Sequence, residues 1–236
     1  MIDNNEYFNK KESDKMLKEL VEKLQKLSRE RVPFDSSRFD DPLAAKIEWS
    51  PAKGGGANFK THNLVQVNRN RIVFRSSIGA RIFYGVFLLM GLGFAVAFSY
   101  PQISEGTFNF SLDSLFPILF GFLFTVVGGL LLYFGTKPIV FEKGNGYFWK
   151  GRKNPETVYN INDQKNCTKL KEIYALQIIS EYVRGNKSSY YSYELNLVLN
   201  DSTRINVIDH GKLEKIRDDA KKLSQFLVKP LWDATL

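Results

Sequence analysis

The sequence predicts a membrane protein of the α+β class, in which a two-helix transmembrane hairpin is inserted into an antiparallel β domain closed by a C-terminal helix. Three observations predict this arrangement. Two long apolar runs, Ile82–Tyr100 and Leu115–Thr136, contain no charged residue. Short stretches that alternate apolar and polar residues lie on both sides of these runs. Apolar residues then recur at helical spacing near the end of the chain.

The two apolar runs are long enough to cross a bilayer. As helices with a rise of about 1.5 Å per residue they would measure roughly 28 and 33 Å, close to the thickness of the hydrocarbon core. Two helices buried in a soluble core would carry polar stripes, whereas both runs are apolar on all sides. We therefore interpret residues 82–136 as a transmembrane helical hairpin.

The distribution of basic residues predicts the orientation of this hairpin. The connection Pro101–Ser114 contains no Lys or Arg, whereas the outer flanks of both runs are rich in them. We expect these flanking residues to form a basic collar that faces an anionic leaflet. The collar comprises Arg69, Arg71, Arg75, Arg81, Lys137, Lys150, Arg152 and Lys153. Because basic flanks remain in the cytoplasm, both termini are predicted to be cytoplasmic.

Small residues in the second run predict close packing between helices. Gly121, Thr125 and Gly129 are spaced by four residues and so lie on one helix face. The face could pack against the first helix of the same hairpin, or it could mediate self-association of copies. No ionisable residue interrupts either run, which disfavours ion or proton transport.

Residues 1–58 are predicted to form an N-terminal amphipathic helix and a linker. The apolar positions of this helix repeat at spacings of three and four. They are Leu17, Leu20, Leu24 and Leu27. The helix could dock on its own domain or bind a partner. The following prolines and the Gly54–Gly56 run indicate a connector or a close backbone approach, and no G-K-S/T sequence follows to make a phosphate loop.

The β domain is predicted to consist of residues 59–77 and 137–236, on either side of the hairpin. Phe59–Val67 and Arg71–Ser76 form one strand pair, joined by an Asn-rich turn. The strands expected after the hairpin are Ile139–Lys143, Tyr147–Arg152, Ile173–Arg184, Tyr190–Leu199 and Arg204–Ile208. A helix from about Gly211 to Val228 has one apolar face and ends before Pro230.

About seven antiparallel strands followed by one amphipathic helix resemble the pleckstrin-homology (PH) fold, on element order from Phe59 to Trp232. The resemblance implies that the helix closes one end of a bent sandwich, with the membrane hairpin inserted between the second and third strands. Across residues 192–199 and 207–211 the chain is also similar to uncharacterised bacterial two-helix inner-membrane proteins. That similarity implies a multi-pass protein of the bacterial inner (plasma) membrane and carries no known activity.

Neither catalysis nor a metal or other cofactor is predicted. The chain has two histidines, His62 and His210, one cysteine, Cys167, and no zinc or nucleophile motif. Asp209 and His210 could form an acid/base pair, but capping of the last helix by Asp209 is the simpler interpretation. The net charge of +8 arises after residue 50. Attraction to anionic lipid explains this charge without nucleic acid.

A contact surface is the function most consistent with these features. The candidate partner-binding residues are Arg184, Lys187, Tyr190 and Tyr191, a basic and tyrosine-rich composition typical of interfaces. The tyrosines could instead cover the sheet. We expect a non-enzymatic, inner-membrane-anchored adaptor whose PH-like domain binds a protein partner or self-associates. The alternatives are an immunity-type membrane protein that neutralises a toxin, and a lipid-headgroup-binding or weakly enzymatic lipid-acting protein.

Overall fold

The computed structural model describes residues 16–17, 34–107, 109, 111–155, 166–185 and 188–235. The chain divides into two compact units, Met1–Ala45 and Lys46–Leu236. In the first unit, Asp35 caps the 3-10 helix η1 (Ser36–Phe39) by accepting a hydrogen bond from the Ser37 N–H. The N-terminal amphipathic helix predicted from the sequence lies outside the described residues, apart from Met16 and Leu17, which are helical and exposed.

The second unit contains two β-sheets. The first has the order β1 (His62–Asn68), β2 (Arg71–Ser76), β3 (Ile139–Glu142), β4 (Tyr147–Lys150) and β5 (Cys167–Lys169). The second has the order β8 (Arg204–His210), β7 (Ser189–Leu199), β6 (Ile173–Arg184) and β9 (Leu231–Asp233). All neighbours are antiparallel except β9, which runs parallel to β6. A short 3-10 helix, η3 (Leu170–Glu172), leads into β6, and a single bridge from Lys60 to His210 links the segment before β1 to β8.

The hydrophobic core lies between the two sheets and the final helix, α4 (Leu213–Leu227). Side chains at alternate strand positions and at the apolar face of α4 meet there. The largest contributors are Phe74, Phe141, Phe148, Leu176, Ile178, Leu195, Ile208, Ile216 and Leu223. The structure is therefore of the α+β class that the sequence predicts, and α4 ends within one residue of the expected position, with Val228 in the left-handed region.

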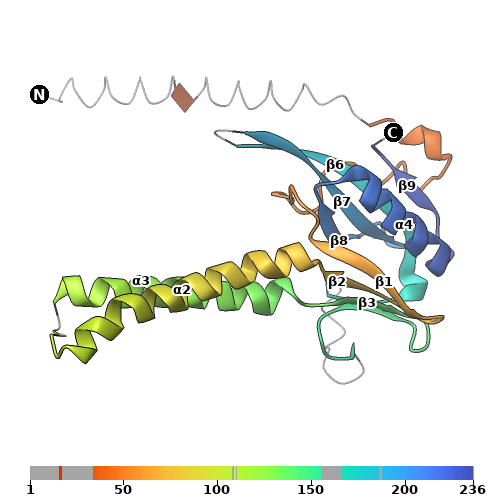
Figure 1. Cartoon of the computed structure of the whole chain (residues 1–236). Coiled ribbons are helices and arrows are strands. Elements are labelled where there is room, and N and C mark those ends of the chain that lie inside the picture. The colour runs from red at the N-terminus through yellow and green to blue at the C-terminus, as the bar shows by residue number, and fades with distance from the viewer. Residues whose placement is uncertain are drawn as a thin grey trace, which may run out of the picture. The chain divides into compact units, whose positions relative to one another are not determined.

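Two long helices, α2 (Ile78–Ser104) and α3 (Leu112–Gly135), leave the β domain from adjacent strands (Figure 1). Strand β2, directly before α2, pairs with β3, directly after α3, so that Phe74 lies opposite Ile139. Ser77 fixes the start of α2, because its hydroxyl accepts a hydrogen bond from the Ala80 N–H and donates one to the Lys60 carbonyl. Helix α2 therefore begins, and helix α3 ends, against the domain with almost no spacer.

Both helices are long and apolar enough to cross a membrane. In the most apolar window of each helix, only 6% of α2 and 17% of α3 is buried within the structure. Their large apolar side chains are therefore mostly exposed, unlike those of a helix in a soluble core.

The two helices pack through small residues, but not through all of those that the sequence predicts. Gly91 of α2 lies against Gly121 and Thr125 of α3, where an added Cβ would come within 2.4 Å of the Thr125 nitrogen. The next contact is made by Gly128, whereas Gly129 has nothing within 4 Å of the position of a Cβ. The contact positions in α3 are thus spaced by four and then three residues, the seven-residue repeat of left-handed helix pairs. The predicted placement of Gly129 in this interface is wrong.

Replacement of Gly128 by Val is expected to loosen the helix pair, whereas Gly129→Val serves as a matched control. At residue 128 the new Cβ would lie 2.3 Å from the Leu88 nitrogen, and a backbone atom cannot move aside locally. Overpacking of this kind costs about 1 to 3 kcal/mol. Thermal unfolding of the purified chain in detergent, followed by helical circular dichroism, should show a lower midpoint for Gly128→Val alone. Equal midpoints for the two variants would contradict this packing.

Candidate functional site

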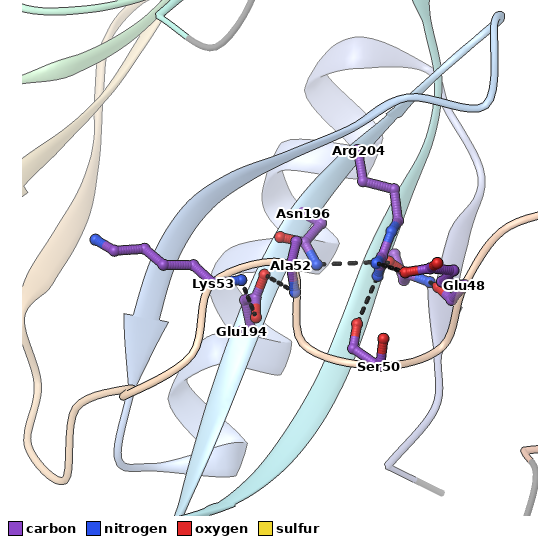
Figure 2. Close-up of polar contacts among 8 residues, drawn as sticks. Glu48, Ser50, Ala52, Lys53, Glu194, Asn196 and Arg204 are labelled. Carbon is purple, nitrogen blue, oxygen red and sulfur yellow. Dashed lines mark hydrogen bonds and ion pairs between the residues drawn. The ribbon is translucent and has the colours of Figure 1, made fainter.

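Residues 48–56 form a strap that lies on the outer face of the second sheet. The alternation of β7 directs Leu195 into the core and Glu194 to the opposite face. The Glu194 carboxylate accepts hydrogen bonds from the N–H groups of Ala52 (3.0 Å) and Lys53 (3.4 Å), as Figure 2 shows. Glu181 holds the N–H groups of Gly55 and Gly56 in the same way, at 3.0 and 3.1 Å.

Two further side chains of the sheet hold the start of the strap. Arg204 donates hydrogen bonds to the Ser50 carbonyl (2.6 Å) and to the Glu48 carboxylate (3.1 Å) (Figure 2). Gln177, which is fully buried, donates to the Glu48 carbonyl at 3.1 Å. Residues 46–58 therefore belong with the β domain, and their assignment to an N-terminal linker within residues 1–58 is wrong. The close backbone approach that the glycines indicate is present.

The end of the strap and the ends of α2 and α3 nearest the β domain line an open pocket of about 690 Å³, which we name the junction pocket. Three lysines from separate elements line it: Lys53 of the strap, Lys137 after α3, and Lys150 at the end of β4. The pocket is also lined by Phe59, His62, Tyr84, Phe134, Asn206 and Asp209. The pocket therefore combines a basic interior with aromatic side chains at the helix ends.

Lys150 is partly buried, whereas Lys53 is exposed. The Lys150 ammonium group donates a hydrogen bond to the Asn206 carbonyl at 2.5 Å. Burial, followed by the Lys53 ammonium group, lowers the pKa of Lys150 to about 8, although Asp209 and Glu194 act in the opposite direction. Lys150 is thus mostly protonated at neutral pH. Of the residues predicted to form the basic collar, Lys150 therefore lines the pocket.

Both histidines are neutral at pH 7. Burial, then the charge of Lys150 and then His210, lowers the pKa of His62 to about 4. Burial, then Lys60 and Lys212, lowers the pKa of His210 to about 4. His210 is fully buried and accepts a hydrogen bond at Nδ1 from the Lys212 N–H. His62 therefore contributes a neutral imidazole to the pocket.

Asp209 lines the pocket. Because successive side chains of β8 point to opposite faces of the sheet, the side chain of His210 points away from that of Asp209. The Asp209 carboxylate accepts a hydrogen bond from the Asn206 amide at 3.0 Å, and burial raises its pKa. Asp209 and His210 do not form an acid/base pair. The expectation that Asp209 caps α4 is also wrong, because Lys212 occupies the N-cap position and no side chain caps it.

Only part of the predicted basic collar surrounds the helix ends. Arg152 donates to the Tyr133 carbonyl and the Thr136 hydroxyl at the end of α3, and Arg81 donates to the Ser76 hydroxyl. The Lys137 ammonium group lies 4.4 Å from the centre of the Phe134 ring. Arg75 and Lys153 are exposed.

Arg69 and Arg71 lie at the opposite end of β2 from α2. Six residues of strand, at about 3.3 Å each, place them roughly 20 Å from the start of the helix. Arg71 pairs with Glu142 at 3.5 Å and its guanidinium group lies 5.6 Å from the centre of the Trp149 ring. These two members of the predicted basic collar therefore do not lie beside the helix ends.

The predicted partner-binding residues have different environments. Arg184 and Tyr191 are exposed on the ribbon formed by β6 and β7, where Tyr191 lies against Tyr182 with ring centres 5.1 Å apart. Tyr190 instead donates a hydrogen bond to the Gly56 carbonyl at 2.8 Å and so holds the strap. Lys187 lies outside the described residues.

Within the described part of the chain, no group of three or more His, Cys, Asp or Glu side chains is placed to hold a metal ion. No protein-family model, curated protein or solved structure matches the chain. Sequence patterns gave no sign of the junction pocket, because Lys53, Lys150 and Asp209 come from distant segments and share no motif.

Proposed function

We propose that this chain is a non-enzymatic, membrane-anchored binding protein in which the α2–α3 hairpin spans the bilayer and holds the β domain against one leaflet. The exposure of the hairpin carries this proposal. Large apolar side chains cover both helices, and a soluble pair of helices would bury such a surface. They include Ile82, Val86, Leu89, Val96, Phe98, Phe116, Leu119, Phe122, Leu123 and Leu130, all exposed.

The junction between hairpin and domain supports this arrangement. Ser77 alone separates β2 from α2, and three residues separate α3 from β3. The domain would thus lie directly against the leaflet. Arg81, Lys137 and Arg152 surround the same helix ends, while the loop at the far end has no basic residue. This distribution supports a cytoplasmic β domain and cytoplasmic termini in a bacterial inner membrane.

The architecture of the β domain supports a PH-like binding module. Strands β1–β5 form one sheet and β6–β9 the other, and α4 packs against the core between them. We propose that the exposed ribbon of β6 and β7, which carries Tyr182, Arg184 and Tyr191, contacts a protein partner or a second copy. Aromatic and arginine side chains are enriched at such contacts.

Extraction from membranes tests the anchoring. After alkaline carbonate washing, the full chain should remain in the membrane fraction. In the matched control, a short Gly-Ser linker joins Ser76 to Lys137 in place of residues 77–136, and this variant should be recovered in the soluble fraction. Recovery of the full chain in the carbonate wash would contradict the proposed function.

A further inference from the structure

Among the described residues that line the junction pocket, lysines outnumber carboxylates. Lys53, Lys137 and Lys150 line it together with one carboxylate, Asp209, and the neutral imidazole of His62. Lys53 and Lys150 lie close enough for the charge of one to disfavour the charge of the other. Ammonium groups that repel each other are stabilised by an anion placed between them. The charge arrangement therefore points to an anionic ligand.

Several polar groups at the pocket are held in place by other parts of the domain. Glu194 fixes the backbone of Lys53, while the Asn206 carbonyl accepts a hydrogen bond from Lys150 and the Asn206 amide donates one to Asp209. Side chains held in this way lose little further conformational entropy when a ligand binds. Lys150, Asn206 and Asp209 are thus held in place before any ligand arrives, whereas the Lys53 side chain is exposed.

The other side of the pocket consists of Tyr84, Phe134 and Gly135, at the ends of the two helices. In the proposed orientation these residues lie at the level of lipid headgroups, where aromatic rings are favoured. A volume of about 690 Å³ exceeds the space that one phosphate ion needs, and it suits a phosphate group carrying an attached alcohol. Asp209 would then accept a hydrogen bond from a hydroxyl of that alcohol.

We propose that the junction pocket binds a phosphate group through Lys53, Lys137 and Lys150, and that in the membrane this group belongs to an anionic phospholipid headgroup. The claim that the phosphate group belongs to a lipid rests on the proposed membrane anchoring. The binding of phosphate by the lysines does not depend on it. A shaped site of this kind differs from the additive, salt-screened attraction that a basic collar exerts on a leaflet.

Calorimetric titration of the full chain in neutral detergent tests the proposal. The probes are a short-chain phosphatidylglycerol and, separately, inorganic phosphate, both at physiological ionic strength. Lys150→Met should weaken phosphatidylglycerol binding about tenfold or more, since a hydrogen bond to a charged group is lost. Lys153→Met, which removes the same charge from an exposed site three residues away, should change the affinity less than about twofold.

A second variant guards against a folding defect in Lys150→Met. Lys53→Met should fold, because the backbone of Lys53 rather than its side chain holds the strap, and it should weaken binding about threefold. The unfolding midpoint of each variant is measured alongside. The pH dependence gives an independent signature: wild-type affinity should fall between about pH 7 and pH 9, as Lys150 loses its proton beside Lys53, Asp209 and Glu194. This fall should be absent in Lys150→Met.

Each outcome decides one part of the proposal. Equal affinities in Lys150→Met and Lys153→Met, or loss of all binding at physiological salt, would overturn the pocket as a phosphate site. Inorganic phosphate that binds as tightly as the lipid would support the phosphate site and overturn the lipid as its source. The chain could also bind phosphate through its lysines and yet be released from membranes by carbonate. That result would support the pocket as a phosphate site and contradict the membrane anchoring.

Discussion

Residues 137–236 expressed alone are expected not to fold. Strand β3 would lose its hydrogen-bonded neighbour β2. The core would lose the side chains of Ile72 and Phe74, which are only 3% and 0% exposed. Each such side chain contributes about 1.5 to 3 kcal/mol. Together with the lost strand pairing and the lost strap, the deficit approaches the whole stability of a domain, about 5 to 15 kcal/mol. The unpaired edge of β3 should also promote aggregation.

The matched control restores these contacts without the hairpin. Residues 46–76 joined to residues 137–236 by a short Gly-Ser linker should give a soluble domain that unfolds cooperatively in urea. The linker can be short because Phe74 and Ile139 are direct neighbours across the two strands. Tryptophan fluorescence reports on the transition, since Trp149 and Trp232 are buried. Cooperative unfolding of residues 137–236 alone would contradict the split organisation of the β domain.

Acidification from pH 7 to about pH 5 is expected to destabilise the β domain through its two histidines. The folded chain holds the pKa of both His62 and His210 at about 4, below the usual 6.5. As the pH falls below 6.5, the unfolded chain binds protons that the folded chain does not, so stability decreases until the pH reaches about 4. At pH 5 this loss is about 2 kcal/mol for each histidine.

Three buried carboxyl groups act in the opposite direction. Burial raises the pKa of Glu194, Asp209 and Asp219, so the folded chain binds protons at these groups before the unfolded chain does. The test is therefore the difference between wild type and a His62→Asn, His210→Asn double variant, in which an amide oxygen replaces each Nδ1. The free energy of unfolding, measured by urea titration, should decrease between pH 7 and pH 5 in both proteins. The decrease should be smaller in the double variant by about 4 kcal/mol. Parallel curves would show that the histidines do not titrate as described.

Local patterns in the sequence predicted the elements well, because each pattern depends on the chain's own periodicity. The apolar runs, the alternating strands and the apolar face of α4 all follow from spacing along the chain. The helices extend beyond the predicted runs, to Ile78 and Ser104 in α2, because flanking residues continue the helix without being strongly apolar. The four-residue spacing predicted a helix contact at Gly129, whereas Gly128 makes it. Which of the two glycines faces the other helix depends on how the helices cross, and spacing along the chain does not determine this crossing.

The site could not be predicted in the same way, because it depends on contacts between distant segments. Glu194 binds the backbone of Ala52, 142 residues earlier, through a carboxylate that would be exposed on an ordinary sheet face. Lys150 and Arg71 both count as basic flanking residues by sequence distance. In the structure one enters the junction pocket and the other lies at a strand end remote from the helices.

The central claim, that residues 78–135 form a membrane-spanning hairpin with both termini in the cytoplasm, is tested most directly by a reporter that is active only outside the cytoplasm. Inserted next to Gly106, at the turn between α2 and α3, the reporter should be active, because this loop lacks Lys and Arg. Fused to the C-terminus, the same reporter should be inactive. Activity at the C-terminus but not at Gly106, or inactivity at both positions of a well-expressed chain, would contradict the account.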